Sequence, residues 1–489
     1  MGILAYLPML AMLLPWREIP AGTPLEIRLT SAVGTYASKA GSPVSAVLTT
    51  ALIADHEVLL AAGSSVTGQV KSVRRVGFGI VHETAAIELE FNRVTLPDGT
   101  IIPISAHVIE VDNARERVGQ SGLIFAERAT ASVSNRAIGY VRMAAGFNIH
   151  AQLGMWAVKT LVSDVPEAEI YFPTGTDFAL DLDAPLSVTA REESADMPRT
   201  TDSLTSDELA ALDEVIASMP QRTANHAHHA SDVINVMFIG TREQVEAAFL
   251  AAGWFPTPPS TFRSHLRNIR AVMENQGNRT APMSALLLAG QAPDMMWQKG
   301  LNDVGKRHHI RIWKRQETWN GQEIWVGAAT HDIDYAFLRP GMPITHRISG
   351  MIDRERDKVV HDLEFASSVD LADWLDRTEV TREMHNATGD RMSTDGRLAV
   401  IQLRDLPAVP LTVSFEAPLP MHGKMMQRLA RREILSLRNE LLRDNSYWRS
   451  YEAIRWAVTA ARHRNETETV AADVAPKGLG RVSGFVALR

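Results

Sequence analysis

The residues best suited to chemistry lie in a short run near the middle of the chain, Lys306-Arg307-His308-His309-Ile310-Arg311. Its guanidinium and ammonium groups can hold a phosphate or carboxylate, and its imidazoles can transfer a proton near neutral pH. A second polar run, Thr330-His331-Asp332, follows later in the sequence. Because a carboxylate beside a histidine orients a general base or a metal ligand, the two runs predict an anion-binding or metal site.

A β-hairpin would bring the two runs side by side. Asn320-Gly321 separates two segments of alternating residues, which is a strong short-range hairpin signal. We expect Trp319 to pair with Gln322 across this two-residue turn, which sets the register of both strands. A bulge in either strand would shift this register.

The expected register places four polar side chains on one face of the hairpin. Counting back from the turn puts Arg311 opposite Thr330 and His309 opposite Asp332. Because successive side chains alternate between the faces of a strand, these four share a face. The other face carries His308 and His331.

Three roles follow for these residues. If the protein is an enzyme, we expect His309 and Asp332 to act together in catalysis. Ligand or phosphate contacts are expected from Lys306, Arg307, His308, Arg311 and Thr330. If a divalent metal ion is bound, its expected ligands are His309, His331 and Asp332, which His346, Asp353, Asp357 and His361 could extend.

A structural interpretation competes with these roles. Histidine and arginine on a sheet face are often buried groups satisfied by neighbouring carboxylates. The run Asp353-Arg354-Glu355-Arg356-Asp357 is typical of a salt-bridged helix face. No spacing matches H-E-x-x-H, and the chain has no G-x-S-x-G, Walker or dinucleotide motif.

Several segments around the hairpin resemble the LssY C-terminal domain family. They are Asp232 to Gly240, Ala252-Gly253-Trp254, Arg307 to Trp313, Trp325 to Asp332 and Asp353 to Asp357. The resemblance spans roughly residues 204–406. The family is named after a component encoded with a bacterial type I secretion system, and it often follows membrane domains of the DedA or phosphatidic-acid-phosphatase type. It implies no particular reaction.

Length and composition limit the functional classes. The 489 residues fit two or three domains, and 45% hydrophobic and 22% charged residues are ordinary for a globular protein. A net charge of -7 gives no argument for nucleic acid binding, so no nucleic acid partner is expected. The absence of cysteine excludes disulfides, thiolate metal sites and a cysteine nucleophile, and it suits an oxidising periplasm.

Residues 19–188 predict an all-β domain, either a barrel or a sandwich. Short alternating runs are separated by turns such as Pro97-Asp98-Gly99. The pattern of residues 20–29 returns weakly in residues 173–182. We therefore expect these segments to be the first and last strands of the domain, closing against each other. This half loosely resembles the β-barrel domain of TrbI/VirB-type scaffold proteins of type IV secretion, which implies the fold without implying a channel.

The first fifteen residues are apolar but shorter than a membrane helix. Two interpretations stay open: a signal peptide, although the basic leader and cleavage site are missing, or a buried first strand. Residues 189–230 predict a linker with a short helix from Ser206. Its histidines, His226, His228 and His229, could hold a transition metal or be solvated.

The second half predicts an α+β domain over residues 231–410, with a mixed or antiparallel sheet. Helices are expected at residues 241–252, 264–275 and 353–366. Residues 418–465 predict a basic amphipathic helical tail that lies on anionic lipid, binds a partner or packs back on its own domain. Residues 470–489 are expected to be disordered.

Two functional hypotheses follow. In the first, the protein is a periplasmic or membrane-associated cell-envelope protein of a Gram-negative bacterium. It would be a scaffold or accessory factor that binds envelope proteins or anionic lipid. In the second, it is a metal-dependent or histidine-based phosphoesterase acting on a phosphorylated envelope substrate.

Overall fold

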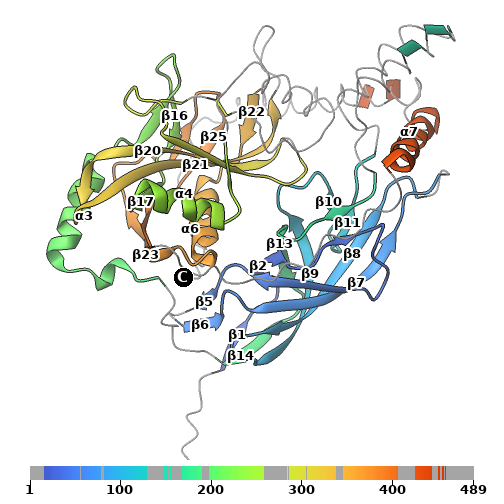
Figure 1. Ribbon diagram of the computed structural model, residues 1–489, viewed down its shortest axis with the longest axis horizontal. Coiled ribbons are helices and arrows are strands. Elements are labelled where there is room, and N and C mark those ends of the chain that lie inside the picture. The colour runs from blue at the N-terminus through green and yellow to red at the C-terminus, as the bar shows by residue number, and fades with distance from the viewer. Residues whose placement is uncertain are drawn as a thin grey trace, which may run out of the picture.

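The computed structural model describes residues 16–54, 57–78, 82–128, 168–189, 198–257, 283–284, 286–303, 305–336, 345–405 and 425–442, and isolated positions near 150 and 455. Within these residues, an N-terminal barrel lies beside a C-terminal sheet covered by helices (Figure 1). The apolar start, the helix expected at 264–275 and the end at 470–489 lie outside the described residues. These three stay predictions.

The N-terminal domain contains a closed barrel of six antiparallel strands, which confirms the all-β prediction. In barrel order they are β8 (Ala86–Thr95), β7 (Ser65–Arg74), β4 (Pro43–Leu48), β2 (Pro24–Leu29), β13 (Asp177–Leu182) and β9 (Ile101–Val111). The barrel closes because β9 pairs with β8, so these six strands have no free edge. The two repeated segments form β2 and β13, which pair directly with each other as expected.

Short strands extend the barrel domain at its ends. They are β1 (Trp16–Ile19), β3 (Val33–Gly34), β5 (Leu52–Ala54), β6 (Glu57–Leu60), β10 (Arg117–Val118), β11 (Leu123–Phe125), β12 (Tyr171–Phe172) and β14 (Leu186–Thr189). The core of the barrel is formed by the inward side chains at alternating positions of its strands, for example Phe91 on β8 and Phe178 and Leu180 on β13.

The C-terminal domain is built on one mixed sheet, which confirms the α+β prediction. Its strand order is β18 (Phe255–Pro256), β19 (Met295–Lys299), β20 (Arg307–Trp319), β21 (Gln322–Ala336), β17 (Val236–Ile239), β26 (Arg397–Leu403) and β23 (Val369–Asp376). β22 (Thr345–Ile348) also pairs with β21. Only the β17–β26 pair of this sheet is parallel among the described strands. Two small ribbons flank it, β15 (Arg222–Ala224) with β16 (Ala230–Val233) and β24 (Glu383–His385) with β25 (Arg391–Ser393).

Helices cover both faces of this sheet. α4 (Arg242–Ala251) and α6 (Ile352–Phe365) share a core with one face, where the Phe249 ring stacks on Trp297. α3 (Ser206–Ser218) packs on the other face through Leu212 and Ile216. α3 and α4 both begin with a capping box, in which the N-cap threonine and the third helical residue bond each other's backbone.

The central hairpin forms from β20 and β21, but its register differs from the expected one. Trp319 pairs with Gln322 as expected, and an irregularity between Lys314 and Thr318 then shifts the pairing. His309 therefore lies opposite Thr330 rather than Asp332. Arg307 takes the place opposite Asp332, and Arg311 lies opposite Ala328. Because the shift is two residues, the side chains keep their expected faces.

The basic tail contains α7 (Met425–Leu442), which packs on the barrel rather than standing free. Leu435 is fully buried in the barrel core, and Arg431 donates a hydrogen bond to the Glu169 carboxylate at 2.7 Å. α7 also exposes Met426 and Ile434 to solvent. In the part of the chain described here, no helix combines the length and apolarity that a membrane crossing requires.

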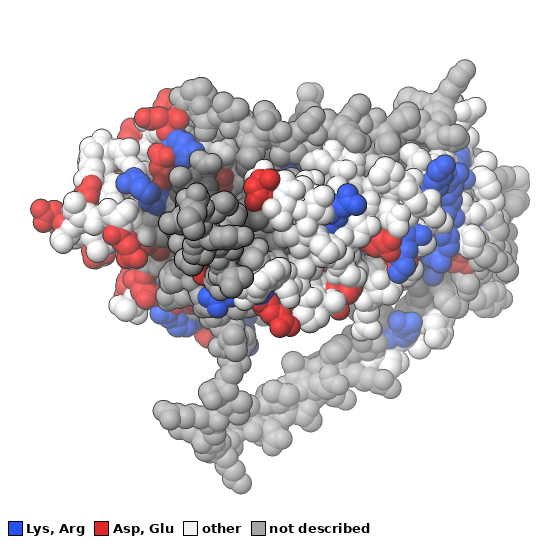
Figure 2. Space-filling model, turned by 90° about the horizontal axis from the view of Figure 1, so that it is seen from below, with Lys and Arg blue, Asp and Glu red and all other residues white. Residues whose placement is uncertain are grey.

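Charged side chains are unevenly spread over the face seen from below. Acidic side chains are frequent at the end formed by the C-terminal domain, and a group of basic side chains lies over the barrel at the other end (Figure 2).

A close approach of two barrel strands gives a test of the fold. A Cβ at Gly68 would lie 2.0 Å from the Glu90 carbonyl oxygen, inside the β7–β8 pairing. We expect Gly68→Ala to lower the free energy of unfolding by about 1–3 kcal/mol, because backbone must move apart. Urea denaturation measures this change. Ser72→Ala, on an exposed part of the same strand, is the control and should change stability by roughly 0.5 kcal/mol or less. A Gly68→Ala protein as stable as wild type would contradict the close pairing of β7 and β8.

Candidate functional site between the two domains

Buried charges join the barrel to the C-terminal domain. Arg28 on β2 donates hydrogen bonds to both carboxylate oxygens of Asp177 on β13, at 2.6 and 3.0 Å. Arg28 also donates to Asp362 on α6 at 3.0 Å, across the domain boundary. The three residues are between 1% and 6% exposed, so water screens these contacts weakly.

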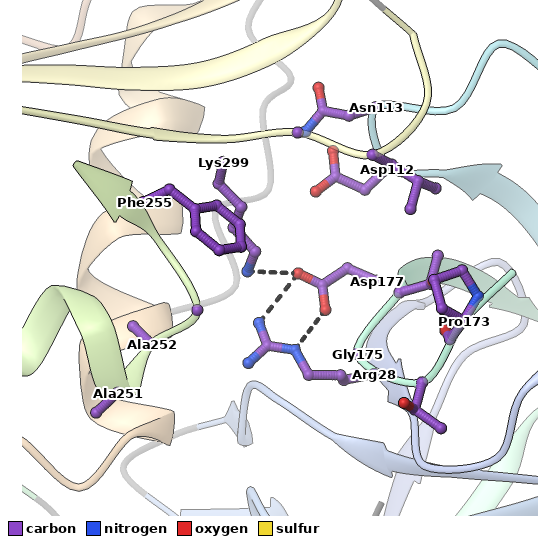
Figure 3. A pocket seen from close by; sticks show the side chains of 15 residues that line it. Arg28, Asp112, Asn113, Pro173, Gly175, Asp177, Ala251, Ala252, Phe255 and Lys299 are labelled. Atoms are coloured by element: carbon purple, nitrogen blue, oxygen red, sulfur yellow. Dashed lines mark hydrogen bonds and ion pairs between the residues drawn. The ribbon is translucent and has the colours of Figure 1, made fainter. Parts of the chain in front are cut away.

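Two lysines complete this cluster. Lys299 on β19 lies 2.8 Å from Asp177 and 3.0 Å from Asp362, and Lys358 on α6 lies 2.9 and 3.0 Å from the same carboxylates. Figure 3 shows Lys299 and Arg28 converging on the Asp177 carboxylate, Lys299 from above and Arg28 from below. Burial would raise the pKa of both carboxyl groups, but the surrounding cations outweigh burial and hold each pKa below its usual range.

Cavities lie on two sides of this cluster. The smaller, about 330 Å³, is lined by Arg28, Asp177 and Lys299 (Figure 3). The larger, about 640 Å³, is called the interdomain cleft here. It is lined by parts of β2, β9, β21 and α6 and by the segment before β5. Clefts between domains are frequent ligand sites.

Two histidines of the hairpin reach the interdomain cleft. His308 and His331 pair across β20 and β21, and their rings stack with centroids 4.3 Å apart. Nε2 of His308 lies 2.9 Å from Asp112, which directly follows β9 of the barrel. On its other side, Nδ1 of His308 lies 2.6 Å from the Glu355 carboxylate on α6.

Asp112, His308 and His331 form a candidate metal centre. Each offers a ligand atom, and these atoms lie within 4.8 Å of one another. Two imidazoles and a carboxylate suit Zn²⁺ or another divalent transition metal. A carboxylate on the second ring nitrogen of a ligating histidine fixes its tautomer, and Glu355 occupies that position on His308. Oε1 of Glu355 is buried and has no hydrogen-bond partner within the described residues.

The pKa values of the three groups are shifted in different directions. Burial would lower the pKa of His308, but Asp112 and Glu355 outweigh burial and raise it to about 10. Burial would raise the pKa of Asp112, but the charged His308 lowers it to about 2. Burial and the neighbouring His308 lower the pKa of His331 to about 4, so its ring is neutral at pH 7.

α6 supplies a cationic wall to the cleft. Arg354 and Lys358, one turn apart, both line it, together with His361. Arg354 is exposed, and no hydrogen bond or ion pair joins it to another described residue. Glu26 of β2 lines the cleft as well and is exposed to it; desolvation by the surrounding cleft walls raises its pKa to about 7, although Lys358 opposes this shift. A carboxyl group with such a pKa can donate or accept a proton near neutral pH.

The predicted residues of the other hairpin face are buried and bonded among themselves. His309 lies 2.8 Å from Asp332 through Nε2, so the expected contact exists. Asp332 also accepts a hydrogen bond from Arg307 at 2.9 Å, and Thr330 lies 3.1 Å from Nδ1 of His309. Arg311 does not join this group; it donates to Asp232.

The predicted metal set is divided between the two faces of the hairpin. His309 and Asp332 lie on the face away from the cleft, whereas His331 faces the cleft beside His308. Lys306 bonds the backbone carbonyl of Ala114 in the barrel at 2.7 Å and thus contacts the other domain. The catalytic and ligand roles of His309 and its neighbours stay predictions.

Sequence reasoning missed Asp112, the ligand that the barrel contributes. It lies 196 residues from His308 in the chain, and no local motif surrounds it. Glu355 and Arg354 were visible only as parts of a charged helical run. That run is partly a salt-bridged face, because Arg356 bonds Asp353, Asp357 and Asp395. Arg354 and Glu355 both face the cleft because α6 packs against the hairpin, a contact that no local sequence pattern records.

The depressed pKa values give a pH-dependent test of the domain boundary. A carboxyl group whose pKa is lower in the folded protein contributes stability above its unfolded pKa, and this contribution is lost as the pH falls. We therefore expect the free energy of unfolding to fall from about pH 4 downward, partly through Asp177 and Asp362. Asp362→Asn should cost about 3–5 kcal/mol at pH 7, because buried cations lose a partner, and should weaken the acid dependence.

Urea denaturation between pH 7 and pH 2.5 measures both effects. Asp213→Asn, on an exposed position of α3, is the matched control and should follow the wild-type curve. An Asp362→Asn protein as stable as wild type at pH 7 would show that the buried cluster does not hold the domains together.

Comparison with known proteins gives a family match within the C-terminal domain. A search of curated proteins found no match. The family model described as LssY C-terminus matches residues 216–398, which include the hairpin and α6, and therefore His308, His331 and Glu355. Asp112 and the barrel lie outside the match. Residues 216–398 thus match the LssY C-terminus family, the family that the sequence motifs indicated.

Proposed function

We propose that the interdomain cleft binds a divalent metal ion and uses it to hydrolyse a phosphate ester. The observation that carries this proposal is the convergence of Asp112, His308 and His331 at the cleft, with Glu355 positioned to orient His308. Three protein ligands leave a coordination position open, which is the usual arrangement of a catalytic rather than a structural zinc site. Such an ion supplies an activated water and polarises a phosphoryl oxygen.

The residues of the chain then have distinct tasks. Arg354 and Lys358 face the same cleft and would neutralise the phosphoryl oxygens of the substrate. Water adds to phosphorus while the bond to the alcohol oxygen breaks, so the products are phosphate and an alcohol. Glu26 lines the cleft as a carboxyl group that can pass the proton from the attacking water to the leaving alcohol.

Binding of an anionic envelope partner, without turnover, is a second candidate. It is favoured by α7, which exposes Met426, Ile434 and Leu437 while Leu435 anchors it on the barrel. An anchored helix with an exposed apolar side is suited to contact lipid or another protein. A periplasmic or envelope location for either function rests on the sequence alone.

Metal retention tests the first proposal directly. The full chain, treated with a chelator and titrated with Zn²⁺ or Mn²⁺ by calorimetry, should bind one ion with high affinity. Asp112→Asn and His331→Gln keep polar side chains at the site, and each should weaken binding at least tenfold. Glu355→Gln should weaken it about 10- to 100-fold, because it orients a ligand without contacting the ion.

The controls separate this site from adventitious histidine binding. The triple variant His226→Ala/His228→Ala/His229→Ala removes three exposed histidines of another loop and should bind the ion as wild type does. Hydrolysis of p-nitrophenyl phosphate should disappear with the chelator, return with the ion and be lost in Asp112→Asn. Thermal unfolding confirms that each variant is folded. Wild-type metal affinity in folded Asp112→Asn would refute the proposal.

A further inference from the structure

Large apolar side chains are exposed at the interdomain cleft. Ile109, Ile333 and Met351 are 39%, 40% and 49% exposed, and all three line the cleft. They come from three separate segments: β9 of the barrel, β21 of the hairpin and the residue directly before α6. Single exposed apolar residues are ordinary, but their convergence from both domains on one cleft indicates a binding surface.

The barrel side of the cleft adds to this apolar surface. Ala51 and Leu52 of the barrel domain, both half-buried, line the cleft as well. An apolar group in the cleft would therefore be covered from both domains. Burial of that group would remove apolar area from water on both partners, which is favourable in proportion to the area.

The apolar and the charged residues follow one another along the same elements. On β21, His331 and Ile333 both line the cleft, on either side of Asp332 in the chain. Along α6, Met351 at the helix start is followed by Arg354 and then by Lys358, at the spacing of successive turns on one side. The cleft therefore presents a cationic, metal-ligating part and an apolar part next to each other.

We infer that the ligand of the cleft is an amphiphile, with a phosphate group at Arg354, Lys358 and the metal centre and a hydrocarbon chain against Ile109, Ile333 and Met351. The inference rests on the proposed phosphate site for the position of the headgroup. A small sugar phosphate would fill the charged part and leave the three apolar side chains uncovered. An alkyl or acyl chain contacts both parts at once.

The chain-length dependence of binding tests this inference. Methyl, butyl and hexyl phosphate are titrated into the metal-loaded full-length protein at concentrations below micelle formation. One fully buried methylene raises affinity about fourfold, and a partly covered one about twofold. We therefore expect hexyl phosphate to bind roughly 30-fold or more tightly than methyl phosphate.

Variants of the apolar surface locate the chain. Ile333→Ser and Met351→Gln should each reduce the ratio of hexyl to methyl affinity by at least threefold. Ile101→Ser is the matched control, because Ile101 is 60% exposed on β9, the strand of Ile109, but does not line the cleft. It should leave the ratio unchanged.

The outcomes separate the hydrocarbon-chain site from the phosphate site beside it. Equal affinities for methyl and hexyl phosphate overturn the amphiphile and leave the metal-dependent phosphate site standing. Absence of binding for both phosphates overturns the phosphate site and the amphiphile with it. Sedimentation with phosphatidylcholine vesicles, with and without phosphatidic acid, separates the sources: selective binding to the acidic vesicles supports a membrane lipid, and hexyl phosphate binding alone supports a soluble amphiphile.

Discussion

The arrangement of the two domains depends on two buried carboxylates, Asp177 from the barrel and Asp362 from α6, that share the same cations. Removing such groups from water is costly, and the cost is offset only where each charge has partners at hydrogen-bond distance. Arg28, Lys299 and Lys358 meet this condition at 2.6–3.0 Å. A sliding or hinged contact would leave these charges unpaired, so the cluster specifies one relative position of the domains.

That fixed position creates the cleft and its histidine site. His308 reaches Asp112 only because β9 of the barrel ends beside the hairpin, and the backbone of Asp303 bonds the carbonyl of Asn113 there. The same hairpin has two polar faces with different surroundings. Its inner face holds His309, Asp332 and Arg307 in a bonded interior group, whereas its outer face directs His308 and His331 to the cleft. The outer pair is therefore the candidate for chemistry because it lines the cleft, whereas His309, of the same residue type and as buried as His308, does not.

Much of the fold could be predicted from the sequence because its signals are local. The Asn320-Gly321 turn, the repeat that forms β2 and β13, and the capping threonines at Thr205 and Thr241 depend on short-range geometry. The register beyond the turn could not be predicted, because no residue type in the polar run between Lys314 and Thr318 indicates the irregularity that lies there. The site was harder still. Asp112 meets His308 through the packing of two domains, and no periodicity in either segment records that contact.

α7 gives the connection between the domains a particular form. The C-terminal domain is joined to the barrel through the chain that follows β14 and, at its other end, through the chain that leads to α7, which is seated on the barrel by Leu435 and Arg431. The domain is thus tethered at both ends to the same body. Two tethers hold the facing surfaces at a high effective concentration and remove most of the entropy that a single linker would retain. The two domain surfaces that a ligand would contact are therefore already ordered in the folded protein. Little of the binding free energy is then lost in bringing them together.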